Sequence, residues 1–247
     1  MDSEVKQLKF KTHKKKELNE AEHELLIDKF EYGELYRQLR INLEYSMVDR
    51  TLRVVNVTST NPEEGKSSIT ANLARVSVAK YPNVLLIDCD LRKPIIHKIF
   101  QVSNSIGLSD LLVNYDTFDV YDDTYFQRFK DVKSSGELCI LPAGTKTPNP
   151  QELLSGDRFK QLITKLKERF EFIVIDCPPV LSVADAIPVS NIADGTMFVI
   201  SAKDTNKHDA KTAITQLTRN GAKLLGTVLT KVERENSNYY YYYYDRK

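Results

Sequence analysis

The sequence predicts an α/β protein with a doubly wound, mostly parallel sheet and helices on both of its faces. Short runs of β-branched and apolar residues alternate with helical patterns from residue 54 to residue 230, which is the order of elements in such a fold. Runs such as Val84–Asp90 and Phe172–Asp176 are apolar almost throughout, as buried strands are. Several of these runs end in Thr, Ser or Asp, and the carboxyl ends of parallel strands meet in one crevice.

Composition indicates one main domain with extensions. The 247 residues are 41% apolar and 28% charged, which is enough to bury one sizeable core. The formal net charge of +1 argues against a dedicated nucleic-acid surface, and we expect no nucleic-acid partner. Cys89, Cys139 and Cys177 form no disulfide framework or metal spacing, which fits a reducing cytoplasm. No apolar run approaches the length of a membrane span, and the first residues lack the apolar region of a signal peptide.

The main domain is expected at residues 20–235, between two polar extensions. Residues 1–19 form a basic arm, for which a solvated tail is the simplest interpretation. Residues 236–247 are a low-complexity tail that contains a run of tyrosines. We expect this tail to be disordered unless a partner captures it.

Periodicity and turn residues place the elements of the domain. Apolar residues that recur at threes and fours predict helices, and short apolar runs predict strands. Pro148-Asn149-Pro150 begins one helix, and Gly221 ends another. The long helices are expected at residues 20–48, 68–80, 150–170 and 207–220. The strands are expected at residues 54–59, 84–90, 138–141, 172–176, 197–201 and 224–230.

Residues 103–136 carry weaker signals. The segment Gly107–Val113 is typical of a short helix. The acidic and aromatic stretch Asn114–Lys133 is interpreted as a surface excursion with no assigned function.

A candidate phosphate-binding loop, Ser59-Thr60-Asn61-Pro62-Glu63-Glu64-Gly65-Lys66-Ser67, lies between the first strand and the next helix. Gly65 lets the backbone approach phosphate, and successive N–H groups at a helix start point at an anion. Lys66 would add positive charge at the β- and γ-phosphates, and Ser67 would place its hydroxyl on Mg²⁺. The alternative is an ordinary strand-to-helix turn, because Thr60 stands where the G-x-x-x-x-G-K-[ST] pattern has its first glycine. The candidate nucleotide-binding residues are Asn61, Pro62, Glu63, Glu64, Gly65, Lys66, Ser67 and Ser68.

Two expected strands end in carboxylates that suit a metal–nucleotide site. The segment VLLIDCD delivers Asp88 and Asp90, and the segment FIVIDCPP delivers Asp176. A carboxylate held rigidly at a strand end accepts a hydrogen bond from metal-bound water or ligates Mg²⁺, as in a Walker B strand. A single Asp of this kind is often only a cap or turn residue. Two such strands beside a Gly-Lys-Ser loop favour the functional interpretation.

The N-terminal helix carries Glu34, Arg37 and Arg40 along one side. An intrahelical ion pair, worth about 0.2–0.5 kcal/mol, accounts for the spacing. The alternative is a contact with a second subunit, in which the arginine forks bind carboxylates. The spacing alone favours the intrahelical pair.

Together these features resemble the bacterial tyrosine kinases (BY-kinases) that control capsular and exopolysaccharide synthesis, in the variant whose kinase domain is a separate cytoplasmic chain. The resemblance rests on the phosphate loop, the segment VLLIDCDLR and the segment FIVIDCPP. It extends to the Glu34-x-x-Arg37-x-x-Arg40 helix and to the tyrosine tail. It covers residues 30–247 and implies a fold similar to the P-loop NTPases.

The resemblance implies transfer of the γ-phosphoryl group of ATP to tyrosine, with Mg²⁺ as the cofactor ion. The implied catalytic residues are Lys66, Asp88, Asp90 and Asp176, with Asp90 accepting the tyrosine hydroxyl proton. The implied metal-site residues are Ser67, Asp88 and Asp176. The implied autophosphorylation sites, on a neighbouring subunit, are Tyr239, Tyr240, Tyr241, Tyr242, Tyr243 and Tyr244. The implied ring contacts are Glu34, Arg37 and Arg40.

The resemblance also implies partners and a location. A separate-chain kinase of this family needs a transmembrane polysaccharide co-polymerase adaptor whose cytoplasmic tail activates it. The chain would then be cytoplasmic and peripheral at the inner face of the cell membrane. It would form a ring-like homo-oligomer, and a cognate tyrosine phosphatase would reverse its phosphorylation.

The sequence departs from the family pattern at two positions. Glu63 stands where the family loop Pro-Gly-Glu-Gly-Lys has its first glycine, and Gly156 stands where the family motif Leu-Leu-x-Ser-x-Arg-Phe has serine. If residue 63 needs a positive φ, a glutamate there is strained.

Two other functions remain open. One is a partition or septum-placement ATPase that phosphorylates nothing; those proteins carry a signature lysine at the position of Asn61. The other is a noncatalytic ATP-binding scaffold. Cys89 and Cys177 neighbour site aspartates, but cysteines on buried strands usually behave as small hydrophobes rather than as a redox switch.

Overall fold

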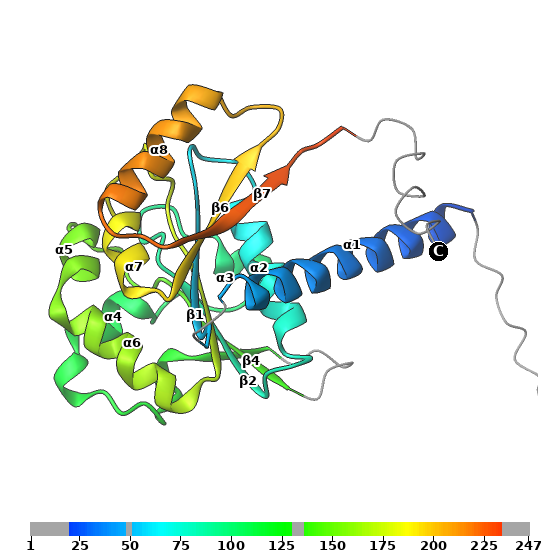
Figure 1. Ribbon diagram of the computed structural model, residues 1–247. Helices are drawn as coiled ribbons and strands as arrows, with labels where there is room; N and C mark the ends of the chain where they lie inside the picture. The colour runs from blue at the N-terminus through cyan, green and yellow to red at the C-terminus, as the bar shows by residue number, and fades with distance from the viewer. Residues whose placement is uncertain (1–19, 48–50, 130–135, 234–247) are drawn as a thin grey trace, which may run out of the picture. The chain divides into compact units, whose positions relative to one another are not determined.

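The computed structural model describes residues 20–47, 51–129 and 136–233, and for residues 20–32 it describes the helical backbone alone (Figure 1). The expected basic arm and the tyrosine tail lie outside the described residues. Contacts within the chain form two units, with the boundary between Leu35 and Tyr36. No helix in the described part of the chain has the length and apolar character of a membrane span.

A seven-stranded sheet forms the centre of the larger unit (Figure 1). The strands are β1 (Val54–Ser59), β2 (Asn83–Asp88), β3 (Gln127–Phe129), β4 (Glu137–Leu141), β5 (Phe172–Asp176), β6 (Gly195–Ser201) and β7 (Leu224–Thr230). They lie in the order β3-β4-β2-β5-β1-β6-β7, and all neighbouring pairs are parallel except β3 with β4. The predicted doubly wound, mostly parallel sheet is therefore confirmed, and β3 is an antiparallel edge strand that was not predicted.

Helices cover both faces of the sheet (Figure 1). They are α2 (Lys66–Ser77), α3 (Ile96–Phe100), α4 (Leu108–Val113), α5 (Pro150–Ser155), α6 (Asp157–Arg169), α7 (Ala186–Ile192) and α8 (Lys207–Arg219). Helix α1 (Glu20–Tyr45) spans the boundary between the two units, and its residues 36–45 belong to the larger one. One apolar cluster, which includes Leu43 and Leu73, joins one face of the sheet to α2, α3 and the end of α1. A second cluster, which includes Phe159 and Leu217, joins the opposite face to α4 through α8.

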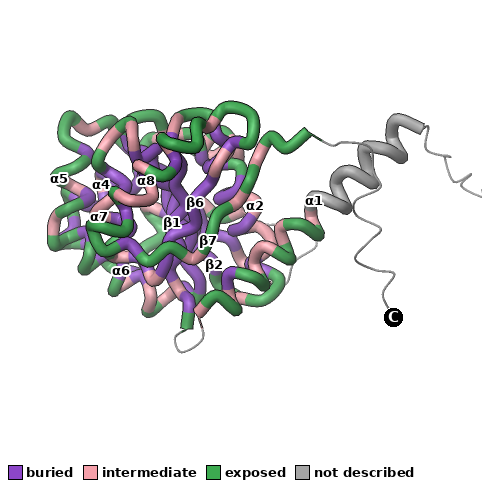
Figure 2. Tube along the Cα trace, turned by 45° about the horizontal axis from the view of Figure 1, so that its top comes forward, coloured by how far each residue is buried: buried purple, intermediate pink, exposed green. Residues whose placement is uncertain are grey.

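Alternation along the strands decides which face each side chain meets. In β2, Val84 and Leu86 pack on the α2 face, whereas Leu85 and Ile87 pack on the α4–α8 face. The same alternation turns Asp88, the last residue of β2, to the α2 face. Among the described residues, those of the central strands are almost all buried (Figure 2). The fully buried Asp88 carboxylate therefore lies on the same face of the sheet as α2, which the phosphate loop enters.

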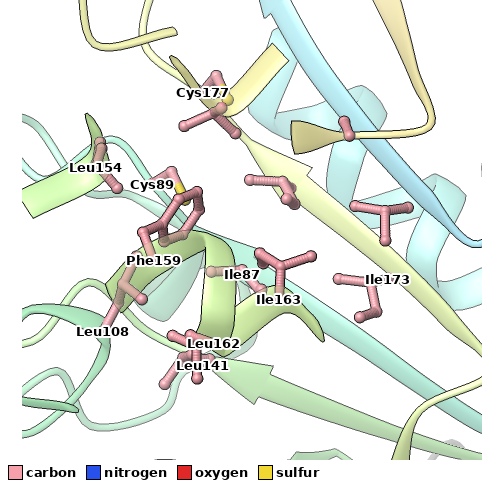
Figure 3. Close-up of a cluster of buried hydrophobic side chains, with 14 of the residues drawn as sticks. Ile87, Cys89, Leu108, Leu141, Leu154, Phe159, Leu162, Ile163, Ile173 and Cys177 are labelled. Atoms are coloured by element: carbon pink, nitrogen blue, oxygen red, sulfur yellow. The ribbon is translucent and has the colours of Figure 1, made fainter. Parts of the chain in front are cut away.

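Cys89 and Cys177 lie on the other face, within the α4–α8 cluster (Figure 3). Both are fully buried, and Leu154 and Phe159 belong to the same apolar cluster. Burial raises the pKa of both thiols well above the usual cysteine range. These surroundings agree with the expectation that the two cysteines behave as small hydrophobes.

The single helix expected over residues 150–170 is wrong. The structure has two helices, α5 and α6, and Gly156 between them has extended backbone angles, φ −73° and ψ 155°. Glycine in a helix interior costs about 1 kcal/mol relative to alanine, whereas it is accepted at an N-cap, the position that Gly156 holds in α6. Leu154 of α5 and Phe159 of α6 both reach the same apolar cluster on either side of the break.

The interpretation of Asn114–Lys133 as a surface excursion is wrong for several of its apolar residues. Phe118, Val120 and Phe126 are buried in the core. Arg169 holds the segment in place because its Nη1 donates to the Val120 carbonyl at 2.9 Å. The acidic residues of the segment concealed this burial in the sequence.

Candidate active site

The chain crosses from β1 to α2 through the predicted phosphate loop. Gly65 has a φ of +91°, a left-handed conformation that favours glycine, and it directly precedes α2. A Cβ at this position would lie 3.3 Å from Cγ2 of Thr230, so the end of β7 also leaves little room for a side chain. The first N–H groups of a helix lack intrahelical partners, and the start of α2 therefore presents donors for an anion.

Glu63 also has a positive φ, +64°, and its side chain is exposed. This left-handed conformation costs an L-residue other than glycine about 1–2 kcal/mol. The condition stated for this position is met, because its φ is positive, and the glutamate is strained there. Exposure leaves its carboxylate in solvent.

Lys66 joins the phosphate loop to both aspartate-bearing strand ends. Its Nζ lies 3.2 Å from Oδ2 of Asp90 and 3.9 Å from Oδ2 of Asp176, and it donates to Oγ of Ser67 at 3.2 Å. Burial alone would lower the pKa of Lys66, but the carboxylates of Asp176 and Asp90 raise it more, so its pKa lies above the usual lysine value. Lys66 therefore stays positively charged although it is buried.

Asp176 ends β5 beneath the start of α2. Its carboxylate accepts hydrogen bonds from the hydroxyl of Ser67 at 2.7 Å and from that of Thr70 at 3.1 Å. Burial raises the pKa of Asp176, and the opposing effects of Lys66 and Ser67 do not cancel this rise. Asp176 thus has the position of a Walker B aspartate against the loop serine.

Asp88 is paired in register with Asp176 but has other hydrogen-bond partners. Its Oδ1 accepts from the Asp90 amide at 3.1 Å, and its Oδ2 accepts from the amides of Ile95 and Ile96 at 3.2 and 3.1 Å. Burial, and then the charge of Asp176, raise its pKa well above the usual carboxyl range. Asp88 therefore organises the turn that follows β2.

Asp90 and Arg92 lie in that turn. Oδ2 of Asp90 faces Lys66, and its Oδ1 accepts from the Lys93 amide at 3.0 Å. Arg92 forms a bidentate pair with the fully buried Asp185, with Nε to Oδ2 at 2.7 Å and Nη2 to Oδ1 at 3.2 Å. The guanidinium of Arg92 therefore binds a carboxylate of the protein itself, that of Asp185.

Glu64 faces into the protein. It is 1% exposed. Its carboxylate accepts from the amides of Thr60 and Asn61 and from the hydroxyl of Thr205, at 2.8, 3.0 and 2.5 Å. Of the two glutamates in the loop, only Glu63 has its side chain in solvent.

The remaining predicted residues have less enclosed positions. Pro62 and Ser68 are exposed at the rim of the loop, and Asn61 is partly buried. Arg40 donates to Glu44 one turn later in α1 at 2.6 Å, so this ion pair is intrahelical. Glu34 and Arg37 are exposed residues of α1, and Glu34 belongs to the smaller unit of the chain. The predicted autophosphorylation sites lie outside the described residues.

Sequence reasoning missed four residues that shape the site. They are Thr70, Asp185, Thr205 and Thr230. Thr70 was predictable, because it follows Ser67 by three residues on α2 and so shares its helix face. The other three come from distant segments and carry no local signal.

The site suits a Mg²⁺–nucleotide complex. Within the described ranges, no three His, Cys, Asp or Glu side chains gather as a metal site. Mg²⁺ at nucleotide sites usually keeps several waters, binds substrate phosphates and takes only one or two protein ligands. The Oγ of Ser67 and the Oδ2 of Asp176, 2.7 Å apart, are hard oxygen donors of the required kind.

Comparison with known proteins agrees with this geometry. Residues 55–244 match the CbiA family, the CobQ/CobB/MinD/ParA nucleotide binding domain. Tyrosine-protein kinase YwqD of Bacillus subtilis (strain 168) is 39% identical over 199 residues, which are 80% of each chain. Tyrosine-protein kinase wzc of Salmonella typhimurium is 32% identical over 83% of this chain, which corresponds to 28% of wzc.

Solved structures show the same relationship. The crystal structure of the chimerical protein CapA2B2 is 34% identical, aligns 81% of this chain with 84% of its own and has a TM-score of 0.72. The VpsO kinase domain is 33% identical, aligns 84% of this chain with 99% of its own and has a TM-score of 0.69. A ParA family ATPase from Chlorobium tepidum TLS, 19% identical with a TM-score of 0.62 over 75% of this chain, shares the fold alone. The chain therefore belongs to the bacterial tyrosine kinases, within the wider CobQ/CobB/MinD/ParA nucleotide-binding family.

Proposed function

We propose that this chain is an ATP-dependent protein-tyrosine kinase that phosphorylates the tail tyrosines of a neighbouring copy and thereby regulates capsular or exopolysaccharide synthesis and export. The observation that carries the proposal is the position of Lys66 between Asp90 and Asp176. It brings the phosphate loop and two strand-end carboxylates to one point. Kinship with tyrosine-protein kinases supports the choice of tyrosine as the acceptor.

The residues at this point suit phosphoryl transfer, which needs positioning and charge neutralisation more than covalent chemistry with the protein. The loop amides and Lys66 bind the triphosphate. The tyrosine oxygen attacks the γ-phosphorus while the bond to the ADP oxygen breaks, and Asp90 accepts the hydroxyl proton. Asp88 keeps the turn that carries Asp90 in place.

We include Mg²⁺ in the proposal. When bound, the ion neutralises charge on the triphosphate. Ser67, Asp88 and Asp176 would hold it directly or through water. The Thr70 hydroxyl also lies against the Asp176 carboxylate, with its one proton shared between that carboxylate at 3.1 Å and the Lys66 carbonyl at 2.8 Å.

Partners and location follow from the same proposal. A transmembrane polysaccharide co-polymerase adaptor would activate the chain at the inner face of the cell membrane, and a tyrosine phosphatase would reverse its action. Copies of the chain would assemble in a ring through Glu34, Arg37 and Arg40. Each phosphate on the tail brings about −1.5 to −2 charge, so we expect accumulating phosphorylation to loosen that ring.

The test is mass spectrometry of the tail after purified chain is incubated with ATP and Mg²⁺, with and without a candidate adaptor peptide. Phosphate on residues 239–244 that disappears in Lys66→Met would support the kinase. ATP hydrolysis with an unmodified tail in every condition would instead favour a partition-type ATPase. ATP binding with neither hydrolysis nor transfer would favour a scaffold.

A further inference from the structure

The buried carboxylate of Glu64 ties the start of the phosphate loop to itself. Its Oε2 accepts from the amides of Thr60 and Asn61, at 2.8 and 3.0 Å. These bonds run backwards along the chain and close the turn from residue 60 to residue 64. Burial of a carboxylate is unfavourable unless hydrogen-bond donors compensate it, and here the loop's own backbone supplies two of them.

A third donor comes from outside the loop. The hydroxyl of Thr205, in the turn between β6 and α8, donates to Oε1 of Glu64 at 2.5 Å. The same hydroxyl oxygen accepts from the Ser201 amide at 2.8 Å, which fixes its orientation. Thr205 therefore has one proton to give, and it gives that proton to Glu64.

The main chain of Glu64 is braced as well. The hydroxyl of Thr230, at the end of β7, donates to the Glu64 carbonyl at 2.6 Å. β6 pairs with β1, and β7 pairs with β6, so both braces come from the strands that follow β1 along the sheet (Figure 1). The loop is thus held against two neighbouring strand ends.

This bracing explains how Glu63 keeps its strained conformation. A residue other than glycine at φ +64° persists only where its surroundings fix the backbone. The carboxylate of Glu64 fixes the residues before Glu63, and the brace from Thr230 fixes the residue after it. Without these contacts, the turn is free to relax to a conformation that no longer fits a triphosphate.

We infer that Glu64 and Thr205 are positioning residues for the nucleotide, which set the shape of the phosphate loop and touch neither ATP nor tyrosine with their side chains. The inference rests on the proposed function of the loop as the ATP site. The loop shape serves the bound ATP and the transition state alike. A variant that loses this loop shape should therefore have a higher dissociation constant and a higher KM for ATP, with kcat at saturating ATP nearly unchanged.

The decisive variant is Thr205→Val, which keeps the size and β-branching of the side chain and removes the donor. We expect calorimetric titration with a nonhydrolysable ATP analogue and Mg²⁺ to show binding weakened about tenfold, the effect of losing one hydrogen bond to a charged group. Thr205→Ser restores a hydroxyl and should bind within about twofold of wild type. Thr215→Val is the matched control, because this hydroxyl of α8 donates only to the Lys211 carbonyl one turn earlier.

Glu64→Gln tests the other side of the contact. One amide oxygen still accepts from the loop amides, but the side-chain nitrogen now meets a Thr205 hydroxyl that no longer finds an acceptor. We expect intermediate weakening, and less than additive weakening when Thr205→Val is combined with it. Hydrogen exchange at the amides of Thr60 and Asn61 should accelerate in both variants, a readout that does not depend on kinase activity.

Equal affinity of Thr205→Val, Thr215→Val and wild type, with unchanged exchange at Thr60 and Asn61, would overturn the inference. A fall in kcat with unchanged affinity would also overturn it, because it would place Thr205 in the chemical step. Binding and exchange need no tyrosine transfer. Failure of the proposed kinase activity would therefore show as an unmodified tail on a protein that still gives these binding differences.

Discussion

Nζ of Lys66 lies 3.2 Å from Oδ2 of Asp90, in an ion pair that is nearly closed to solvent. The pair links the first residue of α2 to the turn after β2, across two different strand ends. A lysine in the phosphate loop and a proton acceptor for tyrosine must both reach the γ-phosphoryl group during transfer. Under the proposed function, the pair holds Lys66 and Asp90 close to the point where the transfer would need both of them.

Asp90→Asn removes the proposed proton acceptor while it keeps the size of the side chain. We expect the rate of tail phosphorylation to fall by about 10²–10⁴-fold, the usual contribution of general-base catalysis. The affinity for ATP should change much less, because the asparagine side chain still offers an oxygen to Lys66. Mass spectrometry of the tail gives the rate, and calorimetry gives the affinity.

The matched control for Asp90→Asn is Asp116→Asn, at an exposed carboxylate whose ion-pair partner is Arg158. This control should transfer phosphate at the wild-type rate. If the rate of tail phosphorylation by Asp90→Asn stays within about tenfold of the wild-type rate, proton abstraction by Asp90 is not part of the rate-limiting chemistry.

Glu63→Gly should tighten ATP binding and stabilise the fold. Glycine adopts the observed φ of +64° without the penalty of about 1–2 kcal/mol that a Cβ brings. Its greater freedom in the unfolded chain offsets about 0.5–1 kcal/mol of this gain, so the net stabilisation should be about 0.5–1 kcal/mol. Urea unfolding measures the stability, and calorimetric titration measures the affinity.

Glu63→Ala separates strain from charge. Alanine removes the negative charge of this exposed carboxylate from the phosphate loop but keeps the strained Cβ, so it should tighten ATP binding without the gain in stability. Unchanged ATP affinity in Glu63→Gly would show that neither strain nor charge at this position limits nucleotide binding.

The parts of the site that were predictable from the sequence are those with a local signature. Strand β5 is a continuous apolar run that ends in Asp176, so its burial and its terminal carboxylate are both visible in five residues. The phosphate loop is equally compact. Asp185 and Thr205 were not predictable because their partners, Arg92 and Glu64, lie 93 and 141 residues away.

In the fold, too, the elements with a local sequence pattern were predictable, whereas the features that depend on packing between distant segments were not. Alternating elements predicted the sheet, whereas the break between α5 and α6 depends on packing against the core. Gly156 was noticed only as a departure from a family motif, although its extended backbone is what separates the two helices. In the stretch before β3, burial of Phe118 and Phe126 was concealed because the same stretch carries Asp116, Asp119, Asp122 and Asp123.

The three cysteines should resist alkylation in the folded protein. Cys89 and Cys177 are fully buried, and burial raises the pKa of Cys139 to about 11. Only the thiolate reacts readily, so buried thiols with raised pKa values are inert near pH 8. Mass spectrometry after treatment with iodoacetamide should find all three unmodified in native protein and modified in urea. Rapid labelling of Cys177 in the native protein would show that its thiol is accessible, and would support a redox switch beside Asp176.

Asp176→Asn should stabilise the fold increasingly as the pH rises from 4 to 7, although it should abolish kinase activity. In the folded protein the pKa of Asp176 is raised above the ordinary carboxyl value of 3.8, because burial disfavours its charge more than Lys66 and Ser67 favour it. The unfolded chain therefore releases this proton at a lower pH than the folded chain. The wild type loses stability as the pH rises from about 4 through the folded-state pKa, and this loss persists above it.

Asparagine at position 176 carries no such charge, so the free energy of unfolding of the variant minus that of the wild type should grow more positive over this range. Asp204→Asn is a control of opposite sign. Hydrogen bonds from Lys231 and Ser201 lower the pKa of Asp204 in the folded protein, so its charge stabilises the fold more as the pH rises. The free energy of unfolding of Asp204→Asn minus that of the wild type should therefore grow more negative over this range. Urea unfolding at pH 4, 5, 6 and 7 measures all three proteins. A difference between Asp176→Asn and wild type that stays constant or declines with pH would mean that Lys66 and the hydroxyls of Ser67 and Thr70 fully compensate the burial of the Asp176 charge.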